Sequence, residues 1–447
     1  MSDKLEKLCE TAAKIVKSYP KSTRIRVISH YDADGITAAG IIGNALYREG
    51  YNFHITLMRN PFNKGIERLL NEKNDLIIFS DMGSAQLEYL EKFDCKVIIL
   101  DHHQLITEKI KDGIIQINAN ACNYDGNYEA CGATLSYSFA VALNRKNEDL
   151  SSLALAGAIG DKQHIGGLKG LNKNILENAL EKKLIEKRTG IKLYGDSIFN
   201  ALFFTIDPFY LGLSGNKQEI SNLLKKLDIK DQSKIEDIEK KSMIKLQSYL
   251  LFKLIKNGCE KKILDILIRE RYYSKSLDCE LERFSDLLDS CGKNGHRGIA
   301  LSLCFFNDSV LQEALKVENE YRQKVLSYLL SLSEKGIIEK EGFRYFYSDD
   351  TSLGGVVAGI AVNYILDDKK PLFSVARKED ELHISCRGNQ KLVENGLDLG
   401  AAMKEVTKNI GGFGGGHKIA AGGTFSIDKE EEFLDKINKI LLNQVKV

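Results

Sequence analysis

VIILDHH, residues 97–103, is an apolar run that ends in a carboxylate and two imidazoles. Four consecutive apolar residues are typical of a strand that is buried on both faces of a parallel sheet. Open α/β sheets bind their ligands at the carboxyl ends of such strands. We therefore predict that Asp101, His102 and His103 lie at the functional site.

Three other segments end in polar residues in the same way. Two of them are further apolar runs, and the third is an apolar pattern with helical spacing. The simplest explanation is that all of these ends converge on one crevice. The segments are 25–29 followed by HYDADG at 30–35, 76–80 followed by Asp81, and 153–159 followed by Gly160-Asp161.

The composition is that of a globular protein with more than one domain. A chain of 447 residues exceeds one ordinary core, so we expect two or three domains. A net charge of +1 argues against a uniformly basic surface, so any nucleic-acid groove must be local. The sequence has no apolar run near the roughly 18 residues of a membrane span, and its start does not resemble a signal peptide, so we expect a cytoplasmic protein without membrane contact. Its nine cysteines form no CxxC pair, which indicates reduced thiols.

Predicted strands and helices alternate in the first third of the chain. This order is typical of an α/β fold with a parallel sheet. Helical patterns cover 35–48 and 84–93, and Gly132-Ala133-Thr134 can open a helix whose amides face the crevice. The predicted strands are 25–29, 53–58, 76–80, 97–100 and 114–118.

The rest of the chain predicts an insertion and a second domain. Residues 191–307 show helical spacing among many charges, so we predict a largely helical insertion, followed by a connecting helix over 308–334. A smaller α/β domain is expected over 335–447. It is predicted from strand-like runs at 343–347, 372–376 and 382–387 and a helical pattern at 354–365.

Taken in order, the polar segments resemble the four motifs of the DHH phosphoesterase superfamily. GGFGGGH, residues 411–417, resembles the glycine-rich signature of the DHH-associated domain. Within the superfamily the chain is most similar to the archaeal RecJ-like single-strand exonucleases, a group that includes the GINS-associated and Hef-associated nucleases. The resemblance implies a parallel-sheet DHH domain over 1–190 and a DHH-associated, substrate-binding domain over 335–447.

Hydrolysis of a phosphodiester needs an in-line hydroxide and positive charge beside the equatorial oxygens. Two divalent metal ions about 3.5–4 Å apart can supply both. Mixed carboxylate and imidazole ligands favour Mn²⁺ and tolerate Mg²⁺, so two Mn²⁺ ions are our first choice. The resemblance places Asp81 as a bridge and His30 at a position where families differ. The ligands that it implies are His30, Asp32, Asp34, Asp81, His102 and Asp161.

Asp101 and His103 are predicted to act in catalysis without binding metal. A carboxylate beside a ligating histidine can orient it, and His103 can contact the phosphate or protonate the leaving oxygen. The alternative is that both residues only end their strand with polar groups. Five such polar positions at the ends of strands and helices favour the catalytic interpretation.

The second domain is predicted to hold the substrate. Gly414, Gly415 and Gly416 can bring backbone amides close to a phosphate, although an ordinary turn is the alternative. By resemblance, Arg387 holds the phosphate as a planar fork and His417 donates to another phosphate oxygen.

We predict a metal-dependent exonuclease that trims single-stranded DNA or RNA to mononucleotides. One alternative is a phosphodiesterase or pyrophosphatase acting on short oligonucleotides, cyclic dinucleotides or pyrophosphate. Another is a non-catalytic partner of the replication helicase. The expected partners are single-stranded nucleic acid, a replication or repair protein, and a second copy of the chain.

Overall fold

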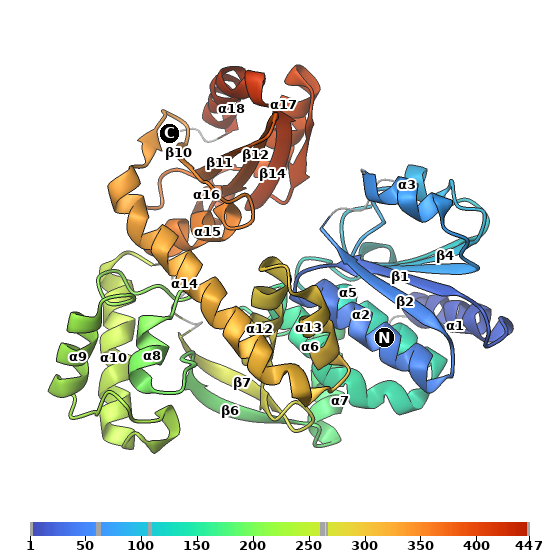
Figure 1. Ribbon diagram of the computed structural model, residues 1–447, viewed down its shortest axis with the longest axis horizontal. Coiled ribbons are helices and arrows are strands. Elements are labelled where there is room, and N and C mark those ends of the chain that lie inside the picture. Colours follow the sequence, from blue (N-terminus) through green and yellow to red (C-terminus); the bar gives the residue numbers. More distant parts are fainter. Residues whose placement is uncertain (1–2, 60–63, 106–109, 260–263, 265–266, 445–447) are drawn as a thin grey trace. The chain divides into compact units, whose positions relative to one another are not determined.

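The structure is a computed structural model in which two compact units are distinguished (Figure 1). Unit 1 contains Met1–Gly190 and Glu270–Glu318, and unit 2 contains Ile191–Arg269 and Asn319–Val447. The α/β fold class predicted from the sequence, with a parallel sheet and a second region rich in β-strands, is confirmed. Among the described residues, no helix is both long enough and apolar enough to span a bilayer. The described residues are 3–444 except 60–63, 106–109, 260–263 and 265–266.

Unit 1 is built on a five-stranded parallel sheet with the order β2-β1-β3-β4-β5. The predicted strands are confirmed, with their ends correct to within one residue. Strand β2 pairs with one side of β1, and β3 pairs with the other side. The carboxyl ends of β1 and β3 therefore form the switch point at which such sheets bind ligands. The strands are β1 (Ile25–His30), β2 (Phe53–Met58), β3 (Leu76–Ser80), β4 (Lys96–Asp101) and β5 (Ile114–Asn118).

Helices cover both faces of this sheet (Figure 1). Alternate strand residues point to opposite faces, so Val27 and Ile98 pack with α1, α2 and α5, whereas Ile28 and Ile99 pack with α3 and α4. The helix predicted over 84–93 is wrong in length, because the amide of Ser84 donates to Asp101 at 2.8 Å and the helix begins only later. These helices are α1 (Asp3–Ser18), α2 (Ala33–Arg48), α3 (Lys64–Asn71), α4 (Leu87–Leu90) and α5 (Gly132–Leu143).

The segment predicted as one insertion, 191–307, divides between the two units. Its last helices, α12 (Leu281–Lys293) and α13 (Arg297–Cys304), pack on α2 through apolar residues such as Leu288 and Cys304. The packing of α13 is close, because a Cβ on Gly40 of α2 would lie 2.4 Å from the Cβ of Cys304. Helices α6 (Ser151–Gly160) and α7 (Gly170–Glu181) complete unit 1, and an unpredicted sheet contains β6 (Ile185–Ile191), β7 (Ile268–Ser274) and β8 (Cys279–Glu280).

Unit 2 contains a six-stranded mixed sheet with the order β13-β14-β12-β11-β10-β9. Its core lies between the sheet and the helices α17 (Leu399–Ile410) and α18 (Glu430–Gln444), with Phe373, Ile384 and Phe433 buried there. The edge strand β13 is formed by the glycine-rich segment, which the sequence did not predict to be a strand. The strands are β9 (Ile338–Glu339), β10 (Arg344–Tyr347), β11 (Leu372–Lys378), β12 (Glu381–Arg387), β13 (Phe413–Gly416) and β14 (Ala420–Ser426).

A second apolar cluster of unit 2 surrounds Tyr210, Leu250 and Val357. The helices that contribute to it are α8 (Ile198–Phe203), α9 (Lys217–Lys226), α10 (Lys240–Lys256), α14 (Leu311–Lys335) and α15 (Gly354–Tyr364). The long helix α14 coincides with the predicted connecting helix and carries the chain from one unit into the other. The other helices are α16 (Gln390–Glu394), α17 and α18.

Candidate metal centre

The ends of β1, β3 and β4 bring carboxylates and imidazoles together in unit 1. Among the residues that the structure describes, three groups of side chains have ligand atoms within 4.8 Å of one another and could hold a metal ion. All six predicted metal ligands belong to these groups, and His103 joins them. The groups are Asp81, His102 and His103; His30, Asp32 and Asp81; and Asp34, His102 and Asp161.

Asp32 and Asp34 are fixed by the start of α2. Asp32 is the N-cap residue, and its Oδ1 accepts the amide of Gly35 at 3.1 Å. Its Oδ2 lies 2.8 Å from His30 Nδ1. Burial alone would raise the pKa of Asp32, but the neighbouring His30 imidazole and the Gly35 amide outweigh it and hold this pKa below its usual value. Asp32 therefore stays ionised, as a metal ligand must be.

Asp34 is held by the N-terminus of α5, as the predicted helix start at Gly132 suggested. The amides of Gly132 and Ala133 donate to Asp34 Oδ2 at 2.7 Å and Oδ1 at 2.8 Å. The positive end of the helix dipole favours this carboxylate. Asp34 is only 2% exposed, so its position is set by these two bonds and by packing.

Asp81 follows β3 with a left-handed backbone, φ 56°, which aspartate adopts more readily than most residues. Its Oδ2 lies 3.6 Å from His30 Nδ1, and its Oδ1 lies 3.2 Å from His102 Nε2. Asp81 thus contacts ligand candidates from both neighbouring motifs, which is the position that a bridging ligand requires. Burial, and then the carboxylates of Asp34 and Asp32, raise the pKa of Asp81 well above its usual range. A cation would relieve this repulsion.

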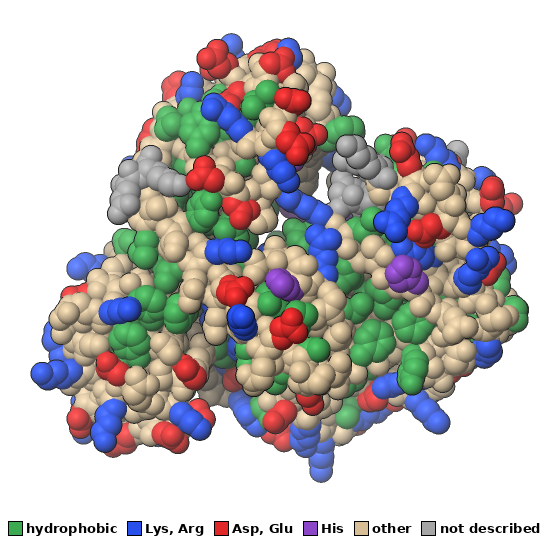
Figure 2. All heavy atoms as spheres, in the orientation of Figure 1, with side chains coloured by type: hydrophobic (Ala, Val, Ile, Leu, Met, Phe, Trp, Pro, Cys, Tyr) green, Lys and Arg blue, Asp and Glu red, His purple; other side chains and the backbone are tan. Residues whose placement is uncertain are grey.

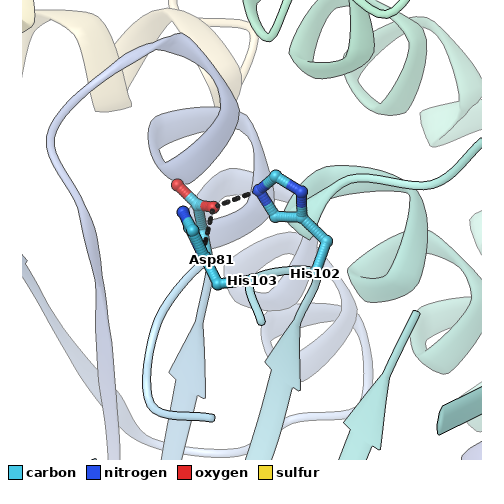
Figure 3. Close-up of side chains that lie close together, drawn as sticks. All are labelled: Asp81, His102 and His103. Atoms are coloured by element: carbon cyan, nitrogen blue, oxygen red, sulfur yellow. Dashed lines mark hydrogen bonds and ion pairs between the residues drawn. The ribbon is translucent and has the colours of Figure 1, made fainter. Parts of the chain in front are cut away.

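Nε2 of His102 points at the carboxylate of Asp81 (Figure 3), because Nδ1 of the same ring is held by a backbone carbonyl. Nδ1 lies 2.6 Å from the carbonyl oxygen of Gly126, which can only accept, so Nδ1 carries the proton. Burial disfavours charge on His102, but Asp161 and Asp81 outweigh it and raise the pKa of the imidazole well above its usual value. A metal at Nε2 would therefore displace a proton.

Asp101 belongs to none of these three groups and holds His103. Its Oδ1 accepts from His103 Nδ1 at 2.7 Å, and its Oδ2 accepts from the amide of Ser84 at 2.8 Å. Burial would raise the pKa of Asp101, but His103 outweighs it and keeps this pKa low. The side chain of His103 is 40% exposed and lies 4.0 Å from Asp81 Oδ1 (Figure 3), so it borders the cluster from the solvent side.

Gln163 was missed by the sequence analysis. Its Nε2 donates to Asp161 Oδ2 at 3.0 Å and to the carbonyl of Gly126 at 2.9 Å, the same carbonyl that fixes His102. Asn172 donates to Gln163 Oε1 at 2.6 Å and fixes the amide orientation. The only sequence signal is that Gln163 lies two residues after Asp161, which is too weak to assign a role.

The predicted substrate-binding residues lie in unit 2, on and beside the edge strand. Arg387 is the last residue of β12, and Gly414, Gly415 and Gly416 belong to β13. His417 follows the strand, and its amide donates to the carbonyl of Ala420 at 2.8 Å. The glycines thus form an antiparallel ladder with β14, and their roles toward a phosphate remain a proposal.

Carboxylates and imidazoles cluster at the switch point of a parallel sheet. This arrangement makes the protein a candidate metal-dependent hydrolase. Residues 24–160 match the DHH family, N-terminal domain, and residues 342–443 match the DHHA1 domain. An uncharacterized protein of Methanocaldococcus jannaschii, MJ0831, is 32% identical over 430 residues, with 94% of each chain covered. The chain therefore belongs to the DHH family, whose members are generally phosphoesterases or nucleases.

Solved structures share the fold at low sequence identity. RecJ from Thermus thermophilus, in complex with Mn²⁺, has a TM-score of 0.62 and 16% identity, covering 98% of this chain and 55% of that chain. The same protein was also solved with Mg²⁺. Cdc45 from Entamoeba histolytica has a TM-score of 0.67 and 12% identity, covering 98% of each chain. The chain spans about half the length of the Thermus RecJ, and its fold is RecJ-like.

Proposed function

We propose that the protein is a metal-dependent phosphodiesterase that acts as a single-strand-specific exonuclease on DNA or RNA and releases mononucleotides. The observation that carries the proposal is the convergence of four carboxylates and three imidazoles, those of Asp32, Asp34, Asp81, Asp161, His30, His102 and His103. This donor set suits two divalent ions, with Mn²⁺ preferred and Mg²⁺ accepted. When bound, the ions supply a hydroxide and neutralise charge on the phosphate.

The side chains around the cluster have separate tasks in this proposal. The α5 amides fix Asp34, and the Gly126 carbonyl fixes the His102 tautomer, so the ligands are held before metal arrives. Asp101 orients His103 through Nδ1, and His103 then contacts the phosphate or protonates the leaving oxygen. In unit 2, Arg387, His417 and the amides of Gly414, Gly415 and Gly416 hold a substrate phosphate.

One alternative uses the same cluster on a smaller substrate, such as a dinucleotide, a cyclic dinucleotide or pyrophosphate. A second alternative is a non-catalytic role beside a replication helicase, which the likeness of fold to Cdc45 brings forward. The complete donor set of unit 1 favours catalysis over this second alternative. A replication or repair protein and a second copy of the chain remain proposed partners.

The deciding experiment compares substrates under one condition. End-labelled single-stranded DNA, single-stranded RNA, duplex DNA, a dinucleotide and pyrophosphate are each incubated with the protein and Mn²⁺, with EDTA as the control. We expect mononucleotides from the single strands and little product from the duplex. Hydrolysis of only the dinucleotide or pyrophosphate would support the first alternative, and no hydrolysis of any substrate would support the second.

A further inference from the structure

The edge of the unit 2 sheet exposes a large apolar ring. Phe413 is the first residue of the edge strand β13 and is 68% exposed. Single exposed apolar residues are common on protein surfaces, so exposure alone assigns no role. The role depends on which groups share its face of the sheet, and the strand register identifies them.

Phe413 lies on the face of the sheet opposite to α17. A Cβ placed on the next residue, Gly414, would lie 2.9 Å from Cγ2 of Thr407 in α17, so Gly414 faces that helix. Successive strand residues point to opposite faces. Phe413 and Gly415 therefore both lie on the face opposite to α17, the face on which α15 packs beside Ser385 and Arg387 of β12.

The same face carries the predicted phosphate-binding residue. Gly415 pairs with Gly422 of β14, and Gly422 pairs with Ser385 of β12. Directly paired residues share a face, and so does Arg387, two residues after Ser385. We call the surface formed by Phe413, Gly415, Gly422, Ser385 and Arg387 the β13 platform.

The β13 platform combines the groups that bind a single-stranded nucleic acid. Gly415 and Gly422 leave bare backbone at its centre, and Arg387 supplies a guanidinium. A second cationic side chain, Lys404, comes from α17 on the other face but still reaches this edge strand, because a Cβ on Gly415 would lie 3.7 Å from its Cε. Proteins bind single strands with cations along the backbone and with aromatic rings on which bases stack.

The spacing on the β13 platform fits one nucleotide. Phe413 and Gly415 are two residues apart, which is about 7 Å along a strand. A nucleotide whose phosphate lies at Gly415 therefore has its base within reach of the Phe413 ring.

We propose that Phe413 stacks against a nucleobase of the substrate, so that the β13 platform selects polynucleotides over phosphates that lack a base. The inference rests on the proposed function for its substrate class, but it assigns a contact that hydrolysis alone does not require. Because every base has a flat face, this contact is tolerant of sequence and available only where the bases are unpaired.

The absence of tryptophan from the sequence makes a direct test possible. Phe413→Trp introduces the sole indole of the chain, and its fluorescence is followed in EDTA, where hydrolysis is suppressed. We expect quenching by oligo(dT) and none by an abasic oligonucleotide of the same length and charge. The matched control is Phe252→Trp in α10, where the native ring is 63% exposed, and it should respond to neither.

A binding measurement completes the test. Phe413→Ala should bind oligo(dT) roughly five- to a hundredfold more weakly than the parent, Phe413→Tyr should restore most of the affinity, and both should bind the abasic chain like the parent. Equal quenching by both oligonucleotides, or unchanged affinity in Phe413→Ala, would overturn the proposal. Quenching in a protein that hydrolyses nothing would support stacking while the proposed function fails. Hydrolysis of single strands without selective quenching would support the proposed function and overturn the stacking.

Discussion

The individual carboxylates of the cluster are held in different ways, so their removal has different consequences. Asp34 accepts two buried amides from α5, and its loss leaves both N–H groups unpaired, at about 1–3 kcal/mol each. Asp161 ends α6 as its C-cap and its side chain is 31% exposed. Asp161 is therefore the better position at which to separate chemistry from stability.

We expect Asp161→Ala to lose nearly all hydrolysis and to keep its fold, because it removes a proposed metal ligand and little packing. Circular dichroism and urea unfolding in EDTA check the fold, calorimetry measures Mn²⁺ binding, and single-strand digestion measures activity. Asp149→Ala, a half-exposed carboxylate paired with Arg48, is the control and should retain both metal binding and activity. Parent-like rates from folded Asp161→Ala would contradict the assignment.

Gln163 gives a second prediction at the residue scale. Gln163→Leu removes the donor to Asp161 and to the Gly126 carbonyl, so two proposed ligands lose their orientation at once. Changes of this kind typically weaken metal binding by about 10- to 100-fold. Calorimetry with Mn²⁺ measures the loss, and unfolding in EDTA separates it from a stability effect. An unchanged Mn²⁺ affinity would show that Gln163 serves the fold alone.

At the scale of elements, the sequence predicts best where the signal is local. The strands of unit 1 are buried apolar runs such as Leu76–Ser80, and their polar ends mark the site without any knowledge of the fold. The strand Phe413–Gly416 was not predicted because glycine has little β propensity, and its pairing with Ala420–Ser426 is a tertiary event. The roles of Gln163 and Gly126 likewise depend on contacts between segments that are distant in sequence.

Close packing of α2, α5 and α6 places the site, and Gly157 of α6 makes it possible. A Cβ on Gly157 would lie 2.4 Å from Ala133 Cβ and 2.7 Å from Asp34 Oδ1. We expect Gly157→Ala to destabilise the protein by about 1–3 kcal/mol through overpacking. Urea unfolding measures the change.

Gly298 in α13 is the matched control, because a Cβ there meets no atom within 4 Å. Gly298→Ala should be neutral or stabilise by up to about 1 kcal/mol, since alanine is the better helix former. Equal effects of the two substitutions would mean that the α6 contact is looser than these distances indicate.

At the scale of the whole molecule, positive and negative charges nearly balance. Lys and Arg side chains alternate with Asp and Glu over the face shown in Figure 2, in agreement with the net charge of +1. Such a surface offers little general attraction to nucleic acid, so recognition must depend on particular residues. In the proposed function, these residues are divided between the two units: those of unit 1 hold the metals, and those of unit 2 hold the substrate phosphate.

This division predicts that substrate binding and metal binding can be separated by one substitution. Arg387→Ala removes a charge-assisted contact to the phosphate, which is worth on the order of 1.5–3 kcal/mol, or roughly ten- to a hundredfold in affinity. Calorimetry should find Mn²⁺ bound as in the parent, while kcat/KM on single-stranded DNA falls by that factor. The control is Arg377→Ala in the same sheet, whose guanidinium pairs with Glu430 at 2.7 Å and whose loss should lower stability but not kcat/KM. If Arg387→Ala lost its metals, or cleaved as fast as the parent, the assignment of phosphate binding to unit 2 would be wrong.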